Sequence, residues 1–160
     1  MQNIIPGVAI PIDGLSIPVS RILGRNPGPM TGPGTNSYLI GKERLCLIDP
    51  GPVDEKQLSN FLEAIKGNKL EYILVTHTHG DHSPAAKMLQ AETGAELVGI
   101  EAPDALGQDH TFSPSKIWGD GDEINCDEYK LRLIHTPAVS YTHLRAHETR
   151  HDLVCRLLLE

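Results

Sequence analysis

The stretch ILVTHTHGDHSPAAKML, residues 73–89, constrains the fold of this chain more than any other part of it. Its apolar start predicts a short buried strand that ends near Val75. Ser83 and Pro84 predict an N-cap followed by a proline at the first position of a helix, which Gly94 closes. The polar residues between Val75 and Ser83 therefore lie in a loop that joins a strand to a helix.

Four possible metal donors fall within six residues of this loop, namely His77, His79, Asp81 and His82. In an extended segment His77 and His79 point the same way, and we expect Gly80 to permit the turn that brings the other two donors back. Imidazole nitrogens with a carboxylate suit Zn²⁺, and also Mn²⁺ or Fe²⁺. The alternative is a polar loop whose histidines only form hydrogen bonds, and it explains this spacing less well.

The elements on either side predict a mixed α+β sheet with helices on its outer face. Strands are expected within residues 8–23, 37–40, 45–48, 72–75, 96–100, 123–126 and 129–135. Apolar residues at helical spacing predict a helix over residues 54–66. Asp49 follows the strand at 45–48, where it is either a turn cap or a residue that supports the metal ligands.

Composition narrows the classes of partner. Fourteen basic against 21 acidic residues give a net charge of −7, which argues against a broad nucleic-acid-coating surface but leaves a local RNA groove open. Three widely spaced cysteines form neither a disulfide framework nor a CxxC metal clip, and favour a reducing compartment. The first residues lack the basic region of a signal peptide, and no apolar run approaches a membrane span. We expect a cytoplasmic protein without a membrane partner.

The segment THTHGDH resembles the HxHxDH motif of the metallo-β-lactamase superfamily. Upstream, RILGRNPGPMTGPGTNSYLIG followed by LCLIDPG resembles the N-terminal block of the β-lactamase-like protein 2 subgroup. The resemblance covers residues 22–137 and implies a metallo-β-lactamase-like αββα sandwich, of which this chain holds about the first half.

The resemblance implies that the protein is a metal-dependent hydrolase. His77 and His79 would hold a first Zn²⁺, Asp81 and His82 a second, and Asp49 would support the metal loop. A metal-activated hydroxide, which Asp81 could orient, would attack an ester, thioester, lactam or phosphodiester bond.

The resemblance breaks off after Pro137. The family's HTPGH element begins here as His135-Thr-Pro, but Ala138 and Val139 stand where its glycine and ligand histidine belong. We therefore expect residues 1–137 to be the N-terminal part of the domain, with weak metal binding, poor catalysis and an uncovered inner sheet face. Residues 138–160 are expected to be a foreign, adapter-derived helical tail, in which His143, His147 and His151 could alternatively form a metal-binding stripe.

Several functions remain in competition. The first is a hydrolase of a small ester or thioester, which the negative charge favours. A single-stranded RNA endoribonuclease is the alternative from the subgroup. A non-catalytic metal-binding or interaction module fits the missing third histidine. A β-lactamase proper is a weaker hypothesis because no signal peptide is seen.

In WGDGDEI, residues 118–124, a hairpin turn is favoured over an acidic metal site. The sequence leaves the oligomeric state open.

Overall fold

A mixed sheet of seven strands, in the order β1-β2-β3-β4-β5-β6-β7, forms the centre of this computed structural model, which describes residues 4–137 and 153–159. The strands are β1 (Ala9–Pro11), β2 (Val19–Leu23), β3 (Asn36–Ile40), β4 (Arg44–Ile48), β5 (Lys69–Leu74), β6 (Glu96–Gly99) and β7 (Lys116–Ile117). Strands β1 to β4 pair antiparallel, whereas β4 to β7 pair parallel. The carboxyl ends of the parallel strands therefore meet at one edge of the sheet.

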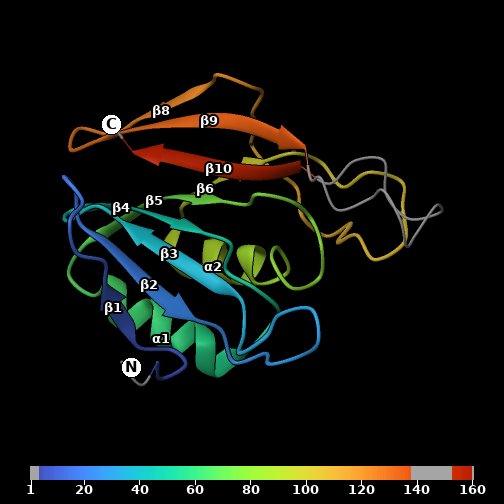
Figure 1. Cartoon of the computed structure of the whole chain (residues 1–160), viewed down its shortest axis with the longest axis horizontal. Coiled ribbons are helices and arrows are strands. Elements are labelled where there is room, and N and C mark those ends of the chain that lie inside the picture. Colours follow the sequence, from blue (N-terminus) through green and yellow to red (C-terminus); the bar gives the residue numbers. More distant parts are fainter. Residues whose placement is uncertain (1–3, 138–152, 160) are drawn as a thin grey trace.

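A smaller sheet and two helices cover the two faces of the large sheet, as Figure 1 shows. The smaller sheet is antiparallel, in the order β10-β9-β8, and consists of β8 (Glu123–Asn125), β9 (Lys130–Pro137) and β10 (Leu153–Leu159). The helices α1 (Glu55–Ile65) and α2 (Ala85–Thr93) lie on the opposite face. The predicted α+β architecture is confirmed, and the described residues build its α, β and β layers.

Alternation along β4 shows how one strand serves both layers. Leu45 and Leu47 pack in the apolar cluster that includes Phe61 of α1. Cys46 and Ile48 point the other way and pack with apolar residues of β8 and β9. Both are at most 3% exposed, so the expectation of an uncovered inner sheet face is wrong where the smaller sheet lies over it.

The two helices confirm most of their sequence signals. Asp54 accepts a 2.9 Å hydrogen bond from the backbone N–H of Gln57 at the start of α1, and Gly94 adopts the left-handed conformation that ends α2. The predicted N-cap role of Ser83 is wrong, because its hydroxyl instead donates to the Asp109 carboxylate at 2.7 Å. Neither helix has the length and apolar character needed to cross a bilayer, within the part of the chain that the structure describes.

The last described segment differs from its prediction. Residues 153–159 form the strand β10 rather than part of a helix, pairing antiparallel with β9 from Leu153 opposite Pro137 to Leu159 opposite Leu131. Backbone pairing with the free edge of β9 decides the conformation here. Ala138, Val139 and the three histidines of the predicted tail lie outside the described residues, so the domain boundary after Pro137 and the foreign origin of the tail stay predictions.

Glu128 connects the two sheets at the end opposite to the carboxyl ends of the parallel strands. Its carboxylate, in the β8–β9 turn, accepts the backbone N–H groups of Lys42 and Glu43 in the β3–β4 turn and of Arg44 at the start of β4, at 2.7, 2.8 and 2.7 Å. These bonds, the one from Arg44 foremost, hold the pKa of the Glu128 carboxyl below its ordinary value. One side chain therefore fixes the relative position of two turns that lie more than 80 residues apart in sequence.

Candidate metal centre

The loop over residues 76–84 begins where β5 ends, at the edge that the carboxyl ends of the parallel strands share. Val75 extends the pairing by donating to the carbonyl of Val98 at 2.9 Å, and the chain then leaves the sheet. The backbone N–H groups of His82 and Ser83 both donate to the carbonyl of His79, at 2.9 and 3.3 Å, which closes a turn. Gly80 is not in the left-handed region and a Cβ there would meet nothing within 4 Å, so the expected need for glycine is wrong.

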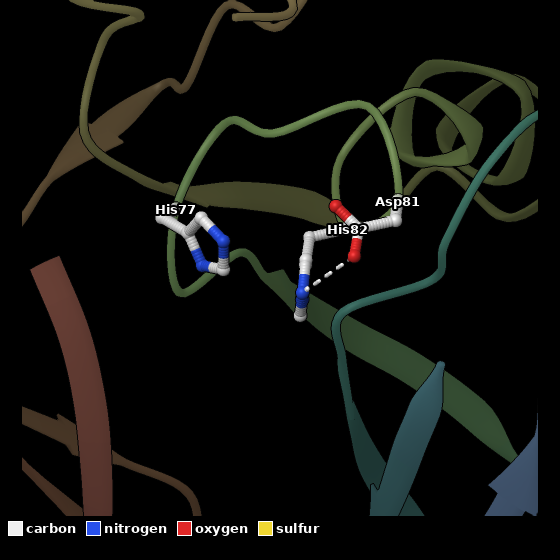
Figure 2. A group of neighbouring side chains, drawn as sticks. All are labelled: His77, Asp81 and His82. Carbon is white, nitrogen blue, oxygen red and sulfur yellow. Dashed lines mark ion pairs between the residues drawn. The ribbon is translucent and has the colours of Figure 1, made fainter. Parts of the chain in front are cut away.

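Three of the four predicted donors converge within this turn. One ligand atom from each of His77, Asp81 and His82 lies within 4.8 Å of the other two, and all three side chains are half-buried. Nε2 of His82 is 3.4 Å from Oδ2 of Asp81, the contact dashed in Figure 2. The imidazole of His77 faces that of His82 with ring centroids 4.0 Å apart. A carboxylate and two imidazoles therefore surround a single point.

The fourth donor lies beside this group. The ring of His79 approaches that of His77 edge-on, with centroids 4.8 Å apart, but His79 does not belong to the convergent set. Its backbone forms an isolated antiparallel bridge with Gln108. The structure thus brings His77, Asp81 and His82 to one place and leaves His79 next to them.

Asp49 supports the loop from beneath. Its side chain, 8% exposed, accepts hydrogen bonds from the backbone N–H and the hydroxyl of Thr76, at 2.8 and 2.7 Å, and from Nδ1 of His82 at 2.9 Å. Its backbone has a φ of 51°, which is uncommon outside glycine, although aspartate tolerates it better than most residues. Asp49 is therefore in direct contact with one proposed ligand and with the residue that precedes another.

The charges of the metal-free cluster follow from its burial and its pairing. Burial, helped by the neighbouring His82, lowers the pKa of His77 to about 4. Burial also acts to lower the pKa of His82, but its hydrogen bonds with Asp49 and Asp81 outweigh burial and raise that pKa to about 9. The hydrogen bond from His82 lowers the pKa of Asp81 to about 2. At neutral pH the cluster therefore holds one neutral imidazole, one imidazolium and a carboxylate.

Two neighbouring loops hold the backbone of the donor loop. On one side, the Thr35 hydroxyl donates to the carbonyl of Asp81 at 2.7 Å. On the other, the N–H of Asp109 donates to the carbonyl of Thr78 at 2.6 Å, and the Thr78 hydroxyl donates to Gln108 at 2.6 Å. Sequence reasoning missed these partners because they lie 30 to 46 residues away along the chain.

Thr76 is a further residue of the site that was not predicted from the sequence, although it lies directly beside the donors. A hydroxyl-bearing residue directly before the first donor histidine is a local signal, because metal-ligating histidines commonly have a hydrogen-bond partner on the other ring nitrogen.

The acidic residues of the 118–124 segment do not form a second metal centre among the residues that the structure describes. The 118–124 segment contains a turn, in which the N–H of Gly119 donates to the Asp122 carboxylate at 2.7 Å. The predicted hairpin is wrong, because this turn joins β7 and β8, which belong to different sheets. The Asp120 carboxylate accepts the backbone N–H of His135, whose side chain is exposed.

A family model of the metallo-beta-lactamase superfamily matches residues 30–154. Among curated proteins, a beta-lactamase-like protein 2 homolog of Caenorhabditis elegans is 34% identical over 140 residues, covering 83% of this chain and 46% of the relative. An atrochrysone carboxyl ACP thioesterase of Cryptosporiopsis sp. is 33% identical over 142 residues, covering 83% of this chain and 40% of the relative. The chain spans less than half the length of these two relatives.

Solved structures agree on the fold. A subclass B3 metallo-beta-lactamase isolated from a soil metagenome library superposes with a TM-score of 0.66, covering 96% of this chain and 58% of that one. Sequence identity is 17%, so the likeness concerns the fold alone. The described architecture is thus a part of the fold that the larger protein shows.

Proposed function

Because the chain belongs to the metallo-beta-lactamase superfamily, we propose that it is a metal-dependent hydrolase acting on an ester, thioester or phosphodiester bond. The observation that carries the proposal is the convergence of His77, Asp81 and His82 within 4.8 Å at the carboxyl ends of the parallel strands. In open sheets of this kind, ligands bind outside those strand ends.

The donor set suits a divalent cation. Two ligands of a tetrahedral zinc ion with bonds of about 2.1 Å are separated by about 3.4 Å, and the contact between His82 Nε2 and Asp81 Oδ2 has that length. Nitrogen and oxygen donors favour Zn²⁺, with Mn²⁺ and Fe²⁺ as further candidates. Asp49 supplies the carboxylate that commonly hydrogen-bonds a ligating histidine.

The proposed ligand set has four residues. His77 and His79 would bind one cation, and Asp81 and His82 would bind a second. A cation bound there acidifies a water molecule and polarises the bond to be cleaved. The Asp81 carboxylate, which is ionised at neutral pH, would accept a hydrogen bond from that water and so orient it. Zinc titration of His79→Ala tests the set, because undiminished zinc uptake would restrict the ligands to the three convergent residues.

A small acyl thioester or ester is the proposed substrate class, and no membrane partner is proposed. The net charge of −7 disfavours a polyanion, and one relative carries the name of a thioesterase. We also propose a cytoplasmic location, since Cys46 and Cys126 are both free thiols.

The decisive experiment loads the 160-residue chain with zinc and offers it an acyl thioester of a small thiol and a single-stranded RNA in parallel. Thioester turnover that is lost in His82→Ala supports the proposal. RNA cleavage instead supports the endoribonuclease alternative. Stoichiometric zinc without turnover of either compound supports a non-catalytic metal-binding module and overturns the hydrolase.

A further inference from the structure

Thr76, the residue directly before the first donor histidine, places its hydroxyl between two side chains of the centre. Its Oγ1 is 2.7 Å from Oδ2 of Asp49 and 3.0 Å from Nδ1 of His77. Thr76 is only 9% exposed, so water competes little for either contact. The three side chains form a chain of hydrogen bonds that ends on a proposed metal ligand.

The direction of these bonds follows from the number of protons. An ionised carboxylate only accepts, and a hydroxyl has a single proton to donate. The Thr76 proton therefore lies toward Asp49, and the oxygen lone pair is left for His77. Nδ1 of His77 must then be the donor in its bond to Thr76. A neutral imidazole has one ring proton, so Nε2 of His77 keeps its lone pair.

The same carboxylate oxygen also governs the second histidine. Oδ2 of Asp49 accepts directly from Nδ1 of His82 at 2.9 Å. It thus acts on one imidazole directly and on the other through the Thr76 hydroxyl. Both Nε2 atoms are left for the side of the rings away from Asp49, and Nε2 of His82 is the atom that faces Asp81.

We propose that Thr76 is a positioning residue, whose hydroxyl fixes His77 in the tautomer with the proton on Nδ1 and the lone pair on Nε2. A histidine can bind a cation only through an unprotonated nitrogen, and a partner on the other ring nitrogen decides which one that is. The inference deepens the proposed metal centre and rests on it for its consequence. The tautomer itself is a property of the metal-free protein.

The test is long-range ¹H–¹⁵N correlation NMR of the metal-free chain, with ¹⁵N-labelled histidine at neutral pH. We expect Nδ1 of His77 to be protonated and Nε2 to be unprotonated in the wild type and in Thr76→Ser. In Thr76→Val, which keeps the shape but lacks the hydroxyl, His77 should shift toward the other tautomer. Thr78→Val is the matched control, because that buried hydroxyl bonds Gln108 and not Asp49. It should leave the His77 pattern unchanged.

Zinc affinity gives the second measurement. Loss of a hydrogen bond behind a ligand typically weakens metal binding about 10–100-fold, so we expect that loss in Thr76→Val and a value near wild type in Thr76→Ser. A wild-type His77 protonated on Nε2 overturns the inference even if zinc binds. A wild-type chain with the expected tautomer that takes up no zinc overturns the proposed function and supports the tautomer assignment.

Discussion

The carboxylate of Asp49 accepts a 2.9 Å hydrogen bond from Nδ1 of His82, which lies 33 residues further along the chain. This contact joins the end of β4 to the loop after β5, and it leaves Nε2 of His82 facing Asp81.

Asp49→Asn should weaken zinc binding about 10–100-fold, because the ligand loses its charged hydrogen-bond partner. Asparagine tolerates the positive φ at this position, so the backbone should be retained. In the metal-free variant the pKa of His82 should fall from its value of about 9, as measured by NMR titration. The exposed Asp104→Asn variant is the control. An unchanged His82 pKa would contradict the role assigned to Asp49.

Removing a convergent donor should abolish stabilisation by zinc. Zinc at 100 times its dissociation constant should add about 2.7 kcal/mol to the free energy of unfolding of the wild type. His77→Ala and His82→Ala should show little of this gain in urea unfolding. His110→Ala, which replaces an exposed histidine outside the donor group, should keep it. Full stabilisation of either donor variant would count against the proposed site.

The stability of the metal-free protein should peak near pH 6.5, the ordinary pKa of histidine. The pKa of His82 is raised to about 9, so its contribution is present below 6.5 and is lost as the pH rises through 9. The pKa of His77 is lowered to about 4, so the unfolded chain takes up a proton that the folded chain refuses as the pH falls from 6.5 toward 4. Each effect is on the order of 2 kcal/mol.

Urea unfolding in the presence of a chelator, repeated between pH 4 and 9, measures this profile. His82→Gln should flatten the alkaline limb and leave a reduced acid limb, because burial still lowers the pKa of His77 when the charge of His82 is absent. Stability that keeps rising above pH 6.5 in the wild type would refute the assigned charges.

Thr35→Val should lower the free energy of unfolding by about 1–3 kcal/mol, because the buried hydroxyl is bonded on both sides. It donates to the Asp81 carbonyl at 2.7 Å and accepts from the Asn26 side chain at 2.9 Å. Ser59→Ala, which removes an exposed hydroxyl on α1, should change stability by less than about 0.5 kcal/mol. Equal effects of the two substitutions in urea unfolding would show that the Thr35 contact does not hold the loop.

Local signals predicted much of this molecule. Helical spacing predicted α1, and the glycine at 94 predicted the end of α2. Ser83 was misassigned because a local rule favoured capping, whereas a distant carboxylate, that of Asp109, takes its hydroxyl. The conformation of residues 153–159 likewise depends on the free edge of β9, which no window of sequence around them reveals.

The candidate site shows the same division. His77, Asp81 and His82 could be predicted because they lie within six residues of one another. The hydrogen bonds that Thr35 and Asp109 form with the donor loop depend on tertiary packing. The residue types at these two positions do not predict those contacts. The position of His79 beside the convergent donors depends on side-chain geometry within one loop, which residue spacing does not predict.

The neighbouring loops hold the donor loop mainly through main-chain groups, since the carbonyls of Thr78, Asp81 and His82 accept the bonds that fix it. Side chains at positions such as 79 and 81 are therefore not needed to shape the loop. Over evolutionary time, a scaffold of this kind can exchange one donor for another, and with it the preferred cation or reaction, while the surrounding architecture persists.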